Sequence, residues 1–290
     1  MSNQVRDLTQ RSISKYVDFF RRFRKPNAIY PTPEEVIARE YDPDAEFEST
    51  FLTLKLEMHS QDGIKFNDDY TTLLQDLVKV VPFMIDKINS IPRPDLGFRN
   101  PDQTHLWDIQ PDDELVQNAM KEVKEVLMEH LGVTQKVINV YDEFLFVNNE
   151  KANVEEFLEK KPYSRQEFLE RIDKYQNTIN KIKTSMPFEI RMSMFLVECE
   201  DINNKLVEEL EQLITLMLNK ITDYVQHDLA TKVQTEVRTI QTQFQDKPNT
   251  TKSLVEAYDY LEDVKTKKRN DIVKDYNDVI EWMSFLYRFP

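Results

Sequence analysis

The chain has 290 residues, 40% of them hydrophobic, which is enough to bury a core in one large domain or two ordinary ones. Its 52 acidic and 38 basic side chains give a net charge of −14, which repels phosphate groups and argues against nucleic acid or a membrane as partner. No apolar run approaches the roughly 18 residues that span a bilayer, and the first residues lack the apolar core of a signal peptide. We therefore expect a cytoplasmic location.

Glycine and cysteine are too scarce for several common sites. The loops that cradle phosphates, GxxxxGK and GxGxxG, need clustered glycines, but the only glycines are Gly63, Gly97 and Gly132. Cys199 is the only cysteine, so neither a disulfide nor a thiolate metal cage can form within the chain. These counts exclude nucleotide binding by either glycine-rich motif and fit a reducing compartment.

Other patterns that carry chemistry are also missing. Paired carboxylates never occur in the DDxxD spacing of all-α terpenoid enzymes, and no histidine follows a glutamate at the Glu-x-x-His spacing of di-iron bundles. The acidic residues that flank Cys199 predict a raised thiol pKa and a poor nucleophile. The sequence therefore predicts no catalytic, cofactor-binding or metal-binding residue and no enzymatic activity for this segment.

The first part of the chain is broken up by proline, because nine of the thirteen prolines fall between residues 26 and 111. Helical spacing predicts a helix over 5–24, and Thr32 with Glu35 forms a capping box that opens a short second helix. Alternating apolar residues over 51–59 and 64–66, joined by a turn at 60–63, predict a β-hairpin. A third helix is expected over 68–91, with Pro82 as a possible kink.

The second part favours long helices. Residues 92–111 show neither helical nor strand periodicity and are interpreted as a linker that packs on the surface. A helix is predicted over 112–147, although Gly132 lowers its helix propensity near the middle. After a short segment near 154–160, a capping box of Ser164 and Glu167 opens a helix that ends near 184. Residues 188–246 contain neither proline nor glycine, and a continuous helix of that length would reach about 90 Å. Ser253 and Glu256 are expected to cap the last helix.

These elements predict a mainly all-α fold of elongated bundles of long antiparallel helices, with one small β-hairpin near residues 51–66. The expected organisation is short helices plus the hairpin over 1–91, an ordered linker over 92–111 and a long-helix bundle over 112–290. The last nine residues include Trp282, Phe285, Leu286, Tyr287 and Phe289, large apolar side chains that need packing partners, so we expect the chain to be part of a larger protein. The basic clusters at 21–25 and 265–269 are either contact sites or solvated helix faces.

Three blocks of sequence resemble the stem, or tail, of axonemal dynein heavy chains. The first, SISKYVDFFRRF at 12–23, is similar to a stem helix that precedes a proline-broken loop there. The second is similar to the hairpin and helix that follow it, and the third to a later stretch that leads into a long helix. The second block comprises FLTLKL at 51–56, IKFN at 64–67 and INSIPRP at 88–94, and the third is MPFEIRMSMFLVEC at 186–199.

The resemblance implies a tail segment ahead of the linker and ATPase ring of a microtubule motor in a cilium or flagellum. ATP and magnesium would bind in the missing motor domain. Implied partners are dynein intermediate and light chains, neighbouring heavy chains and, through the complex, the axonemal doublet microtubule. A generic helical-rod tether or trafficking scaffold would share the long helices and the acidic surface. A membrane-curving helical dimer would need a basic face, and an all-α enzyme a polar cluster.

Overall fold

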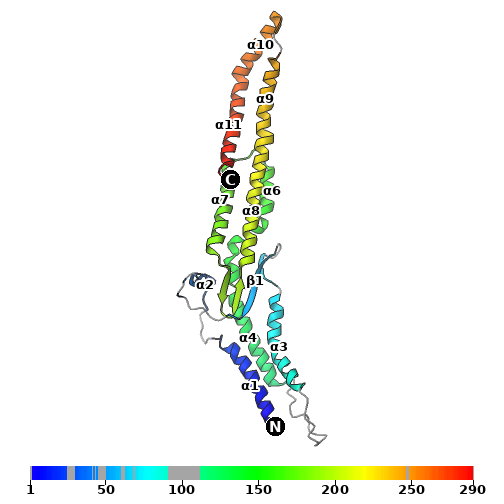
Figure 1. Ribbon diagram of the computed structural model, residues 1–290, viewed down its shortest axis with the longest axis vertical. Coiled ribbons are helices and arrows are strands. Elements are labelled where there is room, and N and C mark those ends of the chain that lie inside the picture. Colours follow the sequence, from blue (N-terminus) through cyan, green and yellow to red (C-terminus); the bar gives the residue numbers. More distant parts are fainter. Residues whose placement is uncertain are drawn as a thin grey trace. The chain divides into compact units, whose positions relative to one another are not determined.

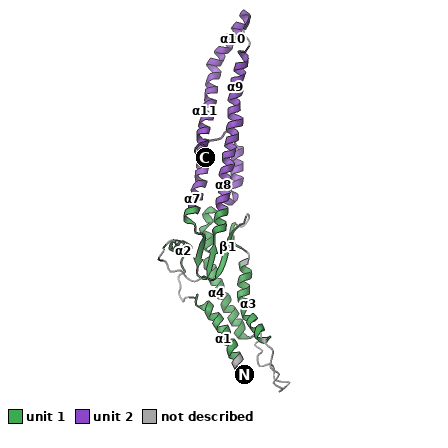
Figure 2. Cartoon of the chain, viewed as in Figure 1, with its two compact units in different colours: residues 1–146, 183–205 green, residues 147–182, 206–290 purple. Residues whose placement is uncertain are grey.

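A computed structural model describes residues 2–24, 30–40, 42, 44, 50–59, 63–67, 69–90, 112–245 and 248–289. The chain is mainly α-helical with a small four-stranded sheet (Figure 1), which confirms the predicted fold class. It forms two compact units (Figure 2). Unit 1 comprises residues 1–146 and 183–205, and unit 2 comprises 147–182 and 206–290. Among the described helices, none is long and apolar enough to cross a membrane.

Three helices of unit 1 pack against one another: α1 (Ser2–Arg21), α3 (Asp69–Asn89) and α4 (Glu114–Thr134). On α1, Ile13, Val17 and Phe20 lie at alternating steps of four and three residues, so they share one buried face. The hydroxyl of Tyr16 donates a 2.6 Å hydrogen bond to the carbonyl of Leu77 on α3. Burial of these side chains holds the three helices together.

The sheet of unit 1 joins two hairpins that lie far apart in the sequence. Its strands are β1 (Leu52–His59), β2 (Gly63–Phe66), β3 (Glu189–Met192) and β4 (Phe195–Glu198), in the order β2-β1-β4-β3. The β1–β2 hairpin is antiparallel, as its alternating pattern predicted, although its turn at 60–62 lies outside the described residues. Strand β1 also pairs in parallel with β4, with Leu52 opposite Phe195.

The second hairpin corrects the prediction of a helix from residue 188. Ile190, Met192, Phe195 and Val197 are buried and alternate with half-exposed neighbours, which is the period of a strand. Ser193 turns the chain between β3 and β4 in the left-handed conformation, at a φ of 55°. The long helix therefore begins only at α8 (Glu200–Asp223).

The predicted helix over 112–147 is also wrong in its second half. After α4 the chain turns through α5 (Val137–Val140) and a 3₁₀ turn (Asp142–Phe144). These turns still bury Val137, Tyr141 and Phe144. The apolar spacing thus marks only part of the core here, because Tyr141 is buried while Ile138 and Leu145 are half-buried, and it does not mark where the helix ends. The short helix α2 (Pro33–Glu40) begins as predicted, with its Thr32–Glu35 capping box formed in both directions, at 2.9 and 3.3 Å.

Unit 2 consists of helices: α6 (Val147–Glu159), most of α7 (Arg165–Ser185), most of α8, α9 (Ala230–Gln243), α10 (Thr251–Asp263) and α11 (Arg269–Leu286). Two π-helical turns, Tyr224–Leu229 and Val264–Lys268, join α8 to α9 and α10 to α11. The core of the unit is aliphatic and aromatic, and includes Val154, Leu158, Phe168, Ile172, Tyr175, Leu206, Leu210, Leu213, Met217 and Ile221.

The start of α10 differs from the prediction. Thr250, rather than Ser253, is the capping residue, because its hydroxyl accepts the backbone N–H of Ser253 at 3.1 Å. The Ser253 hydroxyl lies 3.1 Å from the Thr250 backbone nitrogen and completes the capping box. The cap therefore lies three residues earlier than expected.

The two units divide the chain differently from the sequence-based division at residue 112. Helix α4 joins unit 1 because it packs on α1 and α3, and the β1–β4 pairing brings 183–205 into the same unit. The linker expected over 92–111 lies outside the described residues. Of the aromatic side chains near residue 290, Trp282 and Phe285 are buried within unit 2, whereas Tyr287 is 82% exposed.

Candidate functional site

The described residues contain no group of three or more histidine, cysteine, aspartate or glutamate side chains that could hold a metal ion. Many of the polar contacts lie along single helices, and a smaller set joins different elements.

A histidine and a serine meet inside unit 1. The Ser193 hydroxyl lies 2.6 Å from Nδ1 of His130, an approach that would suit a nucleophile and its base. His130 is fully buried, however, and the rings of Phe23 and Tyr30 stand edge-on against it. The pair ties the β3–β4 turn to α4, and we interpret it as structural.

Cys199 is a buried thiol at the start of α8. Burial raises its pKa to about 12, and the charge of Glu40 adds to the increase against a hydrogen bond with Tyr141. The sequence predicted the direction of this change, but the main cause is desolvation rather than the acidic neighbours in the chain. A thiol in this state is a poor nucleophile.

We expect Cys199 to resist thiol reagents in the folded protein. At about pH 8 its labelling by an aromatic disulfide reagent should be at least about a hundredfold slower than in denaturant, because both the thiolate fraction and access are low. A variant with Cys199→Ser and Glu200→Cys is the control, since residue 200 is exposed and should react quickly when folded. Equal rates for native and denatured Cys199 would contradict the assigned burial.

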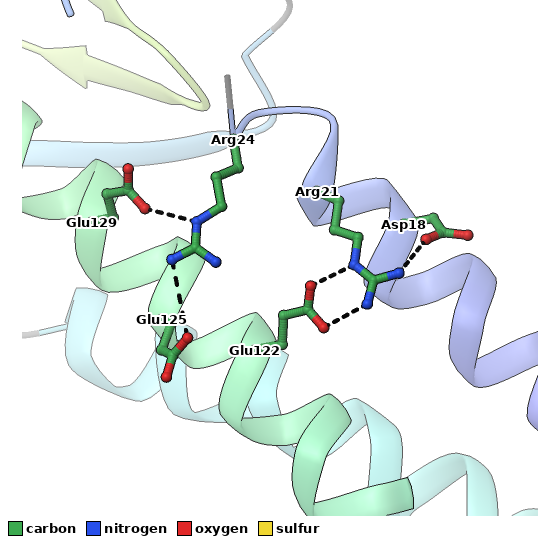
Figure 3. Close-up of polar contacts among 6 residues, drawn as sticks. All are labelled: Asp18, Arg21, Arg24, Glu122, Glu125 and Glu129. Atoms are coloured by element: carbon green, nitrogen blue, oxygen red, sulfur yellow. Dashed lines mark hydrogen bonds and ion pairs between the residues drawn. The ribbon is translucent and has the colours of Figure 1, made fainter. Parts of the chain in front are cut away.

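The first basic cluster proves to be part of a contact within unit 1. Figure 3 shows Arg21 of α1 between Asp18 and Glu122, while Arg24 faces Glu125 and Glu129. The nitrogens of Arg21 lie 2.9 Å from Asp18 and 2.7 Å from Glu122, and Nε of Arg24 lies 3.1 Å from Glu129. The hydrogen bond from Arg21 is the main cause of a lowered pKa at Glu122.

The glutamates of this contact form a ladder that was visible in the sequence. Glu122, Glu125 and Glu129 are three and four residues apart, so they share one face of α4, and Arg21 and Arg24 match that spacing. The sequence does not show which two helices face each other. Because most of these side chains are well exposed, the ladder sets the register of α1 on α4 more than it adds stability.

The second basic cluster is largely paired along its own helix. Lys265 and Lys267 form ion pairs with Glu262 and Asp263, at 3.4 and 2.8 Å. The ammonium of Lys268 lies 4.8 Å from the centre of the Tyr260 ring. Arg269 is the exception, because among the described residues it has neither an ion pair nor a hydrogen bond from its side chain.

A buried carboxylate links α6 to α7 in unit 2. Glu150 is 7% exposed, and one oxygen accepts a 2.7 Å hydrogen bond from the Tyr175 hydroxyl while the other accepts 3.1 Å from Asn153. Lys174 and Arg171 lie 3.6 and 3.8 Å away. Burial alone would raise the pKa of Glu150, but these hydrogen bonds and charges outweigh it and hold the pKa below its ordinary value.

Two kinds of surface remain open to partners. In unit 1, an apolar groove of about 540 Å³ runs between α3 and α4, lined by residues that include Leu74, Val78, Met120 and Met128. In unit 2, neither α9 nor α10 contains a fully buried residue, and α10 and α11 expose a series of large apolar side chains. Exposed apolar surface of this extent marks interaction sites.

The candidate sites therefore define a mainly α-helical protein whose open apolar surfaces lie on helix faces. No known protein-family model matches the chain.

Proposed function

We propose that the chain is a tail segment of an axonemal dynein heavy chain that carries load between the anchored base and the motor domain. The proposal rests on the resemblance of three sequence blocks, at 12–23, 51–94 and 186–199, to the stem of that family. Intermediate chains, light chains and neighbouring heavy chains are the proposed partners, and the ATP and magnesium sites would lie in the motor domain.

One observation carries the proposal: residues from all three blocks meet in unit 1. From the first block, the rings of Phe19 and Phe23 lie 5.0 and 5.4 Å from that of Phe51 in the second. The backbone nitrogens of Phe51 and Leu52 both donate 3.1 Å hydrogen bonds to the carbonyl of Met194 in the third. A resemblance spread over separate blocks is more specific when those blocks build one folded unit, because their spacing is then tied to a shared structure.

The proposed mechanical role follows from the helices of unit 2. Within this unit the helical backbone continues without a break over 206–243, which corresponds to about 55 Å at 1.5 Å per residue. Helices α9 and α11 pack side by side over part of this length. Packed helices resist bending more than single ones, so such a unit can transmit force along its axis.

The test is a pull-down from ciliary extract with the whole chain as bait, followed by mass spectrometry of the bound proteins. We expect dynein intermediate chains, light chains or other heavy chains to be enriched. An unrelated helical bundle of similar net charge serves as control, because a charge of −14 alone retains basic proteins.

Enrichment of vesicle-tethering or coat proteins instead would overturn the proposal in favour of a helical-rod tether or trafficking scaffold. Equal recovery of dynein chains on the control bait would also count against it, because charge alone would then explain the capture.

A further inference from the structure

Helix α11, with Tyr287 directly after it, carries two stripes that are offset by one residue: the outer stripe is apolar throughout, and the inner stripe is apolar except for Asp275. The inner stripe is Ile272, Asp275, Val279, Trp282 and Leu286, and the outer stripe is Val273, Tyr276, Ile280, Met283 and Tyr287. Both follow alternating steps of three and four residues, the spacing of a helix that packs against other helices. A helix with two such stripes is built for two neighbours.

Among the described residues of unit 2, only the inner stripe has a neighbouring helix. Val279 and Trp282 are buried, and Asp275 forms a 2.6 Å ion pair with Lys232 of α9. All five residues of the outer stripe are exposed, from 41% at Met283 to 82% at Tyr287. The outer stripe therefore has the spacing of a helix-packing face, but no described helix of unit 2 covers it.

The outer stripe continues into α10. Leu254, Tyr258 and Leu261 are 59%, 62% and 48% exposed and follow the same steps. Val273 lies twelve positions after Leu261. Continued steps of four, three and four residues would place the next stripe residue eleven positions after Leu261. The π-helical turn Val264–Lys268 lies between them and accommodates one extra residue. This insertion keeps both parts of the stripe on the same side of the helix.

The charged side chains that line the outer stripe on α11 without an ion pair are basic, whereas Asp271, which also has none among the described residues, lies on the opposite side of the helix. Three of its acidic residues are paired within unit 2: Asp275 with Lys232, and Asp278 and Glu281 with Arg165. Among the described residues, the side chains of Arg269, Lys274 and Arg288 form no ion pair. Arg269 lies four residues before Val273, in line with the stripe, and the other two directly follow stripe residues.

These charges disfavour a second copy of the chain as the occupant. In a parallel pair, Arg269 would face Arg269 of the other copy, and Arg288 would face Arg288. In an antiparallel pair, Arg269 would face the end of the stripe that carries Arg288. Like charges would meet in either orientation, within an apolar interface that screens them poorly.

We propose that the outer stripe of α11 docks one amphipathic helix of a partner protein, with an apolar seam that meets the stripe and acidic residues that flank the seam. The apolar contact supplies the affinity, and the basic residues select for acidic flanks. The inference does not depend on which protein class the chain belongs to.

A direct test uses two designed heptad peptides as probes, both apolar at the a and d positions, one with glutamate and one with lysine at e and g. Binding of each labelled peptide to the purified whole chain is measured by fluorescence anisotropy. We expect the acidic peptide to bind at least about tenfold more tightly than the basic one, by a margin that shrinks as salt is added.

Variants of the chain locate the binding. The triple replacement Val273→Gln, Ile280→Gln and Met283→Gln should weaken binding of the acidic peptide at least about tenfold. The matched control, Leu8→Gln, Phe83→Gln and Met128→Gln, changes three exposed apolar residues of unit 1 and should leave it unchanged. Arg269→Glu should reduce the preference for the acidic peptide. Circular dichroism confirms that each variant is folded.

Equal affinity for the two peptides, or no binding of either, would overturn the inference. Loss of binding in the unit 1 control but not in the α11 variant would also overturn it, by moving the site to unit 1. Dimerisation of the chain in sedimentation experiments, abolished by the α11 variant, would show that a second copy covers the stripe.

Discussion

Replacing Phe195 by alanine is expected to lower the free energy of unfolding of unit 1 by about 3–5 kcal/mol. Phe195 is fully buried on β4, directly opposite Leu52 in the parallel pairing with β1. The change would remove a large apolar side chain and leave a cavity at the point where the two hairpins join. Since that pairing brings residues 183–205 into unit 1, its loss affects the whole sheet.

The control is Phe188→Ala, the same replacement in the same short segment. Phe188 is 68% exposed, so we expect its loss to change stability by no more than about 0.5 kcal/mol. Hydrogen exchange followed by mass spectrometry separates the units, because peptides from 52–66 and 189–198 report on the sheet alone. Similar effects of the two replacements would contradict the β1–β4 pairing.

The sequence predicted those helices and strands that are determined by residues close together in the chain. The alternation of Leu52, Leu54 and Leu56 with polar residues predicted β1, and the Thr32–Glu35 capping box predicted the start of α2. In both cases the residues that decide the structure are neighbours in the chain. A helix over 164–184 was predicted for the same reason and is formed as α7.

The largest miss concerns contacts between distant segments. Strands β3 and β4 have four residues each, too few for a clear pattern, and β4 is stabilised by β1, whose residues lie more than a hundred positions earlier. The absence of proline and glycine over 188–246 permits a helix but does not require one, so the tertiary pairing decides. The residues of β3 and β4 alone do not show that β1 will pair with β4.

For the candidate surfaces too, the sequence shows the pattern of residues but not which helices pack together. The two stripes of α11 are visible as periodic apolar residues, but only the fold shows that α9 covers one of them and that the other stays exposed. The basic cluster at 21–25 likewise could be either a contact site or a solvated face. Its Arg21 and Arg24 instead meet the glutamate ladder of α4, a pairing that depends on how α1 packs.

Removal of the Glu150 carboxylate is expected to have the second largest effect, a loss of about 2–3 kcal/mol from the stability of unit 2 in Glu150→Ala. The replacement deletes the acceptor of the buried Tyr175 hydroxyl, and it also removes the counter-charge near Lys174 and Arg171. Glu155→Ala is the matched control on the same helix, because Glu155 is exposed; it should change stability by no more than about 0.5 kcal/mol.

The Glu150 carboxylate also predicts a dependence on pH whose sign can be worked out. Its pKa in the folded protein lies below the ordinary value of 4.5, so the unfolded chain takes up a proton first as the pH falls. The stabilisation by the carboxylate is therefore complete well above pH 4.5 and is lost as the pH falls through the folded pKa. Glu150→Gln cannot titrate, so its stability should decline less over this acidic range.

Urea titrations at neutral pH and at about pH 4 measure this difference. In a Trp107→Phe background, Trp282 is the only tryptophan, and its fluorescence reports on unit 2, where it is buried against Phe168. If Glu150→Gln and the parent protein lose the same stability between the two pH values, the Glu150 carboxylate is not ionised and paired in the folded state. A larger loss in the parent protein would instead identify this carboxylate as part of the acid sensitivity of the helical unit.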